Sequence, residues 1–239
     1  MKTSCKALVA GSLLLASGVA AAADSSLSAN VGLTSDYRFR GVSQSAKDPA
    51  LQGGVDYTHP SGFYLGTWAS TIDFDAGPGL NPDADFELDL YGGYKWKMSG
   101  IEWDAGFIHY AYPGSKSSFD LPFTELYFGG TYGPVNAKIF YTDDYTGPTS
   151  KSATYLTVGL TQELGSGFTL GASVGRSSGG GIKDTFGDDY TDFKIGVSKD
   201  FFGVTFNLSY VDTSGISPDI KTDVFNTEGT VVLTATKTF

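Results

Sequence analysis

The feature that most constrains this chain is an alternation of apolar and polar residues with a period of two. Within residues 101–110, Ile101 and Trp103 fall on one face. Glu102 and Asp104 fall on the other. This period is typical of β-strands that have one apolar face. It recurs along the chain and predicts strands at 27–40, 50–59, 62–72, 84–95, 101–110, 123–132, 135–141, 156–160, 168–174, 193–197, 202–210 and 224–239.

The connections between these segments alternate strictly between long and short. Short ones fall at 58–62, 95–100, 133–134, 163–167 and 199–203. Long ones fall at 41–49, 73–84, 111–122, 143–152, 177–189 and 213–221. This rhythm is typical of an up-and-down barrel whose termini lie on the short-turn side, with long loops outside the cell and tight turns in the periplasm.

Two architectures fit alternating strands. A soluble β-sandwich hides its apolar face, whereas a membrane barrel turns that face toward lipid and its polar face toward the lumen. The membrane barrel is favoured because strands of about ten residues suit a tilted crossing of the bilayer. Charged residues also stand in mid-strand on the polar face, while the apolar face is nearly free of charge. The predicted fold class is therefore all-β, a transmembrane up-and-down antiparallel β-barrel of twelve strands.

The N-terminal residues read as a secretory signal peptide. Lys2 and Lys6 precede the apolar run ALVAGSLLLASGVA, and an A-x-A site ends at Ala23. We predict a signal peptide at 1–23 and a single barrel domain at 24–239. The one cysteine of the sequence, Cys5, would leave with the peptide.

The charge of the chain excludes one class of partner. Its formal net charge is −10, and removing the signal peptide would make it more acidic. Such an acidic chain is unsuited to binding nucleic acid, and its charge also argues against a polybasic patch that would bind a membrane surface. No stretch after residue 23 approaches the ~18 apolar residues of a spanning helix.

Aromatic residues suggest how the barrel would sit in lipid. In the stretch SDYRFRGVSQS, we expect Tyr37 and Phe39 at headgroup depth on the outside of the first strand, where amphipathic rings are favoured. A matching periplasmic girdle would consist of Tyr94, Trp103, Tyr132, Phe168 and Phe202. In 62–72 the pattern leaves two faces open, Phe63 with Leu65 or Tyr64 with Trp68.

The C-terminal sequence VVLTATKTF ends in Phe239 after alternating apolar residues. This looks like the signal by which bacterial outer-membrane barrels are handed to the barrel-assembly machinery. Lys237 departs from the aromatic or apolar residue that is usual two places before the end.

The stretches SDYRFRGVSQS, QGGVDYTHPSGFYLGTWAS and DLYGGY resemble the signatures of the TorF-type porin family of proteobacterial outer-membrane proteins. The resemblance is sharpest over residues 31–110. It implies an outer-membrane barrel that acts as a channel, and it carries over no substrate and no catalytic residue.

Strand parity predicts which charged side chains line the lumen. The inward acids outnumber the inward bases, so the interior would have a negative potential that concentrates cations. The alternative is that these charges pair across a plugged lumen and only stabilise it. The predicted pore-lining residues are Asp36, Arg38, Arg40, Asp56, Asp85, Glu87, Asp89, Glu102, Asp104, Glu125, Lys138, Asp192, Lys194 and Glu228.

Catalytic residues are not predicted. A hydrolase site would require one of the two histidines near a nucleophile and an orienting acceptor. His109 lies near Ser115, Ser117 and Ser118 without a motif, and an Asp–His pair could use only Asp104 or Asp120.

Cofactors and resident metals are not predicted either. Acidic residues at Asp73, Asp75, Asp83 and Asp85 leave a calcium site open, although the spacing is not that of an EF-hand. The glycines of SSGGGIKD follow no expected strand-to-helix turn, which argues against phosphate binding.

The predicted function is a narrow outer-membrane channel for passive diffusion of small hydrophilic solutes, preferring cations. The alternative from another class is a non-conducting barrel whose long surface loops serve adhesion or structure, and an enzyme ranks third. The predicted partners are outer-membrane lipid, lipopolysaccharide, the barrel-assembly machinery and small solutes.

Overall fold

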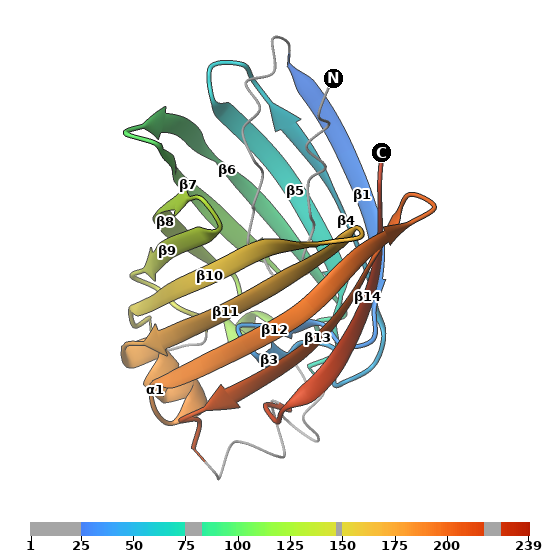
Figure 1. Ribbon diagram of the computed structural model, residues 1–239. Coiled ribbons are helices and arrows are strands. Elements are labelled where there is room, and N and C mark those ends of the chain that lie inside the picture. Colours follow the sequence, from blue (N-terminus) through green and yellow to red (C-terminus); the bar gives the residue numbers. More distant parts are fainter. Residues whose placement is uncertain (1–24, 75–82, 147–149, 218–225) are drawn as a thin grey trace.

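The computed structural model describes residues 25–74, 83–146, 150–217 and 226–239 and forms one closed antiparallel barrel (Figure 1). Twelve strands close it in chain order, which confirms the predicted up-and-down topology. The strands are β1 (Ser26–Thr34), β4 (Ala50–Thr58), β5 (Phe63–Thr71), β6 (Phe86–Met98), β7 (Ile101–Ala111), β8 (Phe123–Tyr132), β9 (Val135–Thr142), β10 (Ala153–Gly165), β11 (Phe168–Ser178), β12 (Tyr190–Phe201), β13 (Val204–Ser214) and β14 (Thr230–Thr238). The predicted signal peptide lies outside the described residues.

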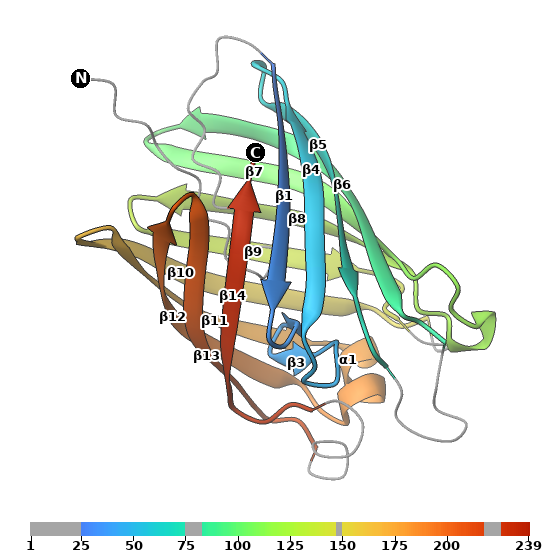
Figure 2. The same cartoon turned by 90° about the vertical axis from the view of Figure 1, so that its right-hand side faces the viewer.

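The barrel closes between its first and last long strands, β1 and β14, which lie side by side in Figure 2. The Phe239 amide donates to the Ala29 carbonyl at 2.8 Å, so pairing continues to the last residue. Strand β1 begins and strand β14 finishes on the side of the barrel that carries the short turns, here called the short-turn end. The opposite end, which carries the long connections, is the long-loop end.

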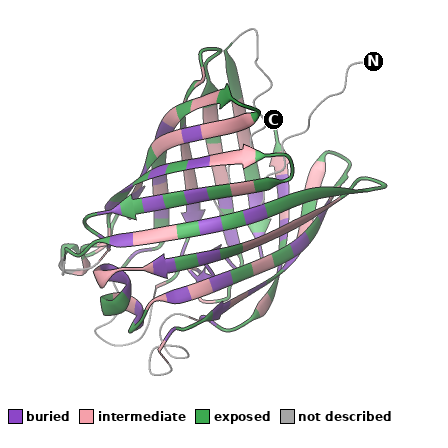
Figure 3. Ribbon diagram, turned by 60° about the vertical axis from the view of Figure 1, so that its left-hand side comes forward, coloured by how far each residue is buried: buried purple, intermediate pink, exposed green. Residues whose placement is uncertain are grey.

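Exposure alternates along much of the barrel wall, which gives the banding in Figure 3, although the short-turn half of β10 is exposed throughout. On β13, Leu208 faces outward and is 56% exposed, while its neighbour Ser209 is buried. On β8, Leu126 faces outward and Glu125 is fully buried. The barrel therefore has an apolar outside and a polar inside, as the alternation predicts.

The structure decides which face of residues 62–72 points outward. Phe63 and Leu65 are exposed on the outside, whereas Tyr64 and Trp68 are partly buried on the inside. Outside, near the short-turn end, Trp96 and Trp103 stack with centroids 6.5 Å apart. No helix among the described residues is long and apolar enough to span a membrane.

The first long connection departs from the sequence-based expectation. Strand β1 ends at Thr34, and residues 35–49, here called the inner loop, fold into the barrel instead of extending the strand (Figure 2). The loop contains a two-stranded ribbon of β2 (Arg38–Phe39) and β3 (Val42–Ser43). The chain reverses between them at Arg40 and Gly41, which have φ of 48° and 85°.

The expectation that Tyr37 and Phe39 face lipid is therefore wrong. Tyr37 is 6% exposed, and its hydroxyl donates to Glu87 Oε1 on β6 at 2.7 Å. The Phe39 ring packs edge-on against Tyr110 of β7 at 5.5 Å. Inside the barrel, the inner loop contacts both apolar and charged side chains of the wall, so its own residues alternate as those of a strand do. Periodicity therefore cannot distinguish this loop from a strand.

A second long connection also closes the long-loop end. Helix α1 (Gly180–Phe186) follows β11, contrary to the expectation that the SSGGGIKD glycines precede no helix. Its Ile182 and Phe186 are buried in a cluster with Tyr190, Tyr110 and residues from other strands. The helix has only seven residues and caps the barrel wall.

Candidate functional site

The candidate site is the lumen together with the inner loop that occupies its long-loop end. Arg40 anchors this loop to the opposite wall. Its Nη2 donates to Glu125 Oε2 on β8 at 2.6 Å, and both side chains are almost completely buried. Tyr110 Oη donates to the same carboxylate oxygen at 3.1 Å. The Arg40 guanidinium also lies 4.2 Å from the centroid of the Tyr155 ring and 5.3 Å from that of Phe140.

Arg38 holds the loop together and ties it to the connection before β14. Its Nε donates to Asp36 Oδ2 at 2.6 Å, and Ser43 Oγ donates to the other oxygen of Asp36. Its Nη1 donates to the backbone carbonyl of Asn226 at 2.5 Å. The loop is thus fixed to the barrel at two places by charge-assisted hydrogen bonds, a buried one to Glu125 and a partly buried one to Asn226.

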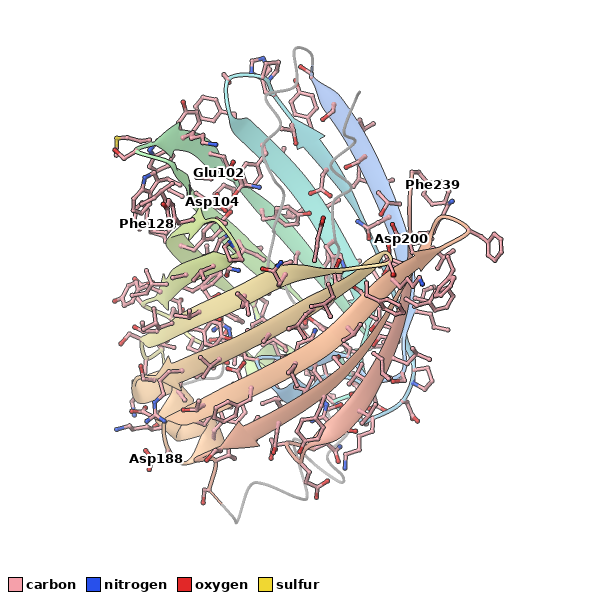
Figure 4. All side chains as sticks on the ribbon, in the orientation of Figure 1. Glu102, Asp104, Phe128, Asp188, Asp200 and Phe239 are labelled. Carbon is pink, nitrogen blue, oxygen red and sulfur yellow. The ribbon has the colours of Figure 1, made fainter. Side chains whose placement is uncertain are left out.

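Acids on the lumen wall accept hydrogen bonds from tyrosines. Tyr91 Oη donates to Asp56 at 2.6 Å, and Tyr155 Oη donates to Asp192 at 3.1 Å. Asp104 accepts from the Lys138 ammonium at 2.6 Å. Figure 4 labels Asp104 and Glu102 near the short-turn end, on β7.

Exposure of the inward side chains differs between the two ends. Thr34 and Thr213, toward the long-loop end, are buried. Asn30, Asn207 and Lys95, toward the short-turn end, are partly exposed. Water therefore reaches the lumen wall from the short-turn end, while the inner loop and its contacts fill the other.

The predicted pore-lining residues divide by position. Nine are buried within the barrel: Asp36, Arg38, Arg40, Glu87, Asp89, Asp104, Glu125, Lys138 and Asp192. Three inward-facing ones are partly exposed: Asp56, Glu102 and Lys194. Asp85 and Glu228 are exposed and lie before β6 and β14, and Glu228 pairs with Lys47 at 2.7 Å.

Two properties of charged side chains inside the barrel were not predicted from the sequence. Lys95 lies on β6 and faces inward, with its ammonium 4.8 Å from the centroid of the Tyr64 ring. The sequence predicts a short connection at 95–100, but β6 continues to Met98. The Asp89 carboxylate is fully buried, and neither of its oxygens has a hydrogen-bond partner among the described residues.

The candidate pair of His109 with Asp104 does not form. His109 lies on the outside of β7, where its Nδ1 contacts Thr124 Oγ1 at 2.9 Å. Asp104 points to the inside of the same strand. His59 contacts Ser61 in the turn between β4 and β5.

Metal-binding clusters of three or more acidic, histidine or cysteine side chains do not occur in the described part of the chain. Asp75, one residue of the acidic stretch considered for calcium, lies outside it. The described residues of that stretch include Asp83, which pairs with Lys116 at 3.0 Å.

Comparison with known sequences assigns the chain to a family. The sequence model of a bacterial family of unknown function, Gcw_chp, matches residues 19–239. The chain belongs to this family. No curated protein matches it in sequence.

Comparison with solved structures shows that its fold is that of known porins. The NanC porin is 11% identical and has a TM-score of 0.55, with 88% of this chain and 98% of that one covered. An outer-membrane channel from Pseudomonas putida F1 is 12% identical with a TM-score of 0.53, over 90% of this chain and 96% of that one.

Proposed function

We propose that this Gcw_chp protein is an integral outer-membrane porin-like channel for small hydrophilic solutes. The observation that carries the proposal is the reversed polarity of the closed barrel. Large apolar side chains cover its outside, while acids, lysines and hydroxyls line its inside. Such a surface is favourable only against lipid, and such an interior only against water or paired charges. The fold shared with solved porins supports the same function.

The orientation that we propose places the short-turn end and both chain termini in the periplasm. The long connections, the inner loop and α1 then face outward, as in barrels with short periplasmic turns. The TorF-type resemblance of residues 31–110 is consistent with this proposal and stays a prediction.

A second candidate function is a non-conducting barrel with adhesive or structural surface loops. The filled long-loop end favours it, because the inner loop is anchored there by the buried Arg40–Glu125 ion pair. The two candidates differ in one measurable property, which is conductance.

We propose further that the channel prefers cations. Within the barrel, Arg38, Arg40 and Lys138 are each paired with an acid. Asp56 and Asp192 accept hydrogen bonds from tyrosine hydroxyls and are not the acids that pair with these bases, although Arg40 also acts on Asp192 electrostatically. Charges on a confined wall act over distances comparable with the Debye length of ~8–10 Å.

Replacing Asp56 and Asp192 together with asparagine should reduce the cation preference. Asparagine keeps an oxygen that can accept the tyrosine hydroxyl, so the barrel should fold normally. The measurement is the reversal potential across a salt gradient in a planar bilayer, which should move toward zero in the double variant. Asp48→Asn, in the exposed part of the inner loop, serves as the control and should not change it. Anion preference in the wild type would contradict the proposal, as would an unchanged potential in the double variant.

We also propose that Phe239 is read by the barrel-assembly machinery. Its side chain is 73% exposed beside the seam where β14 meets β1 (Figure 4). Deleting it should lower the amount of folded barrel in the outer membranes of cells, while refolding of purified protein in detergent should change little. Equal outer-membrane levels with and without Phe239 would contradict this role.

A further inference from the structure

Strand register brings aromatic residues from distant parts of the chain into one inward-facing row. The row runs from β5 to β12, each position being the cross-strand partner of the next. Its members, here called the aromatic row, are Tyr64, Gly93, Gly106, Tyr127, Phe140, Tyr155, Ser177 and Tyr190. Five of these eight positions are aromatic.

The rings of this row are in contact across the wall. The Tyr127 and Phe140 centroids lie 5.4 Å apart, and those of Phe140 and Tyr155 lie 6.0 Å apart. Between Tyr64 and Tyr127, where the row has glycines, the two tyrosine hydroxyls meet each other. The row is therefore continuous from β5 to β10.

The two glycines keep the tyrosine rings flat against the wall. A β-carbon at Gly93 would lie 2.6 Å from the Tyr64 hydroxyl, and one at Gly106 would lie 2.6 Å from the Tyr127 hydroxyl. A larger residue at either position would push the ring toward the barrel axis. The rings thus lie along the wall, where Tyr127 and Phe140 are buried and Tyr64 is partly exposed.

The row climbs along the barrel because the strands are tilted. Tyr64 is the second residue of β5, next to the turn at the short-turn end. Tyr190 is the first residue of β12, next to the connection that contains α1 at the long-loop end. The aromatic row therefore links the water-accessible mouth of the lumen with the end closed by the inner loop.

A parallel row of polar groups accompanies it on the short-turn side. Its members are Lys95, Asp104, Gly129, Lys138, Thr157, Gly175 and Asp192. It carries ammonium donors and carboxylate acceptors beside the ring faces. Apolar faces flanked by a few placed polar groups are the usual composition of small-molecule sites.

Three cationic side chains of the protein already lie over these ring faces. The Lys95 ammonium lies 4.8 Å from the Tyr64 centroid, and the Lys138 ammonium lies 4.7 Å from that of Tyr127. The flat guanidinium of Arg40 lies 4.2 Å from the Tyr155 centroid and 5.3 Å from that of Phe140. The inner loop thus covers the outer part of the aromatic row, whereas Tyr64 at its other end is clear of Arg40 and partly exposed.

We propose that the aromatic row is a binding track for neutral cyclic sugars. The C–H face of a pyranose ring would stack on Tyr64, Tyr127 and Phe140 in turn, while its hydroxyls would bond to the flanking Lys and Asp side chains. The proposal rests on the proposed channel function and names the solute class that the channel takes. Stacking on Tyr64 and Tyr127 requires the sugar to displace the Lys95 and Lys138 ammonium groups from the ring faces, and passage beyond Phe140 requires it to displace Arg40.

The test compares glucose with sorbitol, which has a similar size and hydroxyl content but no ring. Purified protein is reconstituted in liposomes, and the swelling rate is measured with each solute. The wild type should admit glucose faster by roughly two- to tenfold, the contribution expected of an aromatic contact. The Tyr64→Leu/Tyr127→Leu double variant should lose this preference while still admitting sorbitol.

Two matched variants keep the test specific. Tyr91→Leu removes an inward tyrosine of β6 that lies outside the aromatic row, and it should retain the preference. Tyr127→Phe keeps the ring and should retain it as well. Equal glucose and sorbitol rates in the wild type would overturn the binding track but not the channel function. The same holds if Tyr91→Leu loses the glucose preference as fully as the Tyr64→Leu/Tyr127→Leu variant does. Entry of neither solute, with the barrel folded, would overturn the channel function itself.

Discussion

Replacing Arg40 with methionine is expected to release the inner loop from the lumen wall. The substitution leaves Glu125 fully buried with only the Tyr110 hydroxyl on the carboxylate oxygen that Arg40 now binds. Removing one partner of a buried ion pair costs about 3–5 kcal/mol because the remaining charge is not compensated. The loop can escape this cost by undocking, which lets lumen water reach Glu125.

Amide hydrogen exchange measures the undocking directly. The Gln44 amide donates to the Tyr37 carbonyl at 2.7 Å inside the loop, so it reports on the docked state. In Arg40→Met its exchange should accelerate by roughly two to four orders of magnitude, the factor that corresponds to the lost free energy. The double variant Arg40→Met/Glu125→Gln should recover much of the protection, because no buried charge is left over.

Lys47→Met is the matched control. Lys47 lies in the same loop and pairs with Glu228, but both side chains are about half exposed. Exposed pairs contribute about 0–1 kcal/mol, so exchange at Gln44 should change little. Unchanged exchange in Arg40→Met would show that the Arg40–Glu125 pair does not hold the loop.

Replacing Leu208 with arginine is expected to destabilise the folded barrel by about 2–4 kcal/mol in a lipid bilayer. Leu208 lies in the middle of β13 and faces outward with 56% of its surface exposed, so the guanidinium would be placed in hydrocarbon if the barrel spans the membrane. The measurement is the free energy of unfolding in urea, followed by fluorescence of the three tryptophans.

Asn207→Arg provides the control one residue away. Asn207 faces the lumen near the short-turn end and is partly exposed, so arginine there can be solvated. Its cross-strand partners Ser198 and Thr234 are small and uncharged. Equal destabilisation by Leu208→Arg and Asn207→Arg would contradict the assignment of the outer face to lipid.

The barrel was predictable from the sequence because its determinants are local. Alternation within a strand tells which side chains share a face, as for Leu126 and Glu125 on β8. The alternation of long and short connections then orders the strands. Each strand and each connection is contained in roughly ten consecutive residues.

The inner loop was not predictable because its determinants are distant in sequence. Tyr37 and Phe39 have the period of a strand, and only their partners reveal that they lie inside. Those partners are Glu87 on β6 and Tyr110 on β7. Arg40 meets Glu125 across 85 residues of sequence.

The aromatic row could not be read from the sequence for a related reason. Tyr64 and Tyr127 are neighbours only through the register of β5, β6, β7 and β8, which alternation does not specify. Hydropathy also suggests that tyrosines face lipid, and this left the inner face of 62–72 undecided. The glycine opposite each ring is the signal that could have indicated the inward direction.

Single-channel recording of the purified, refolded protein in a planar lipid bilayer tests the channel function most directly. The account predicts discrete conductance steps in the wild type, and larger steps when residues 36–47 of the inner loop are replaced by a short glycine–serine linker. A bilayer whose conductance stays at background with both proteins, although both are inserted and folded, would contradict the account.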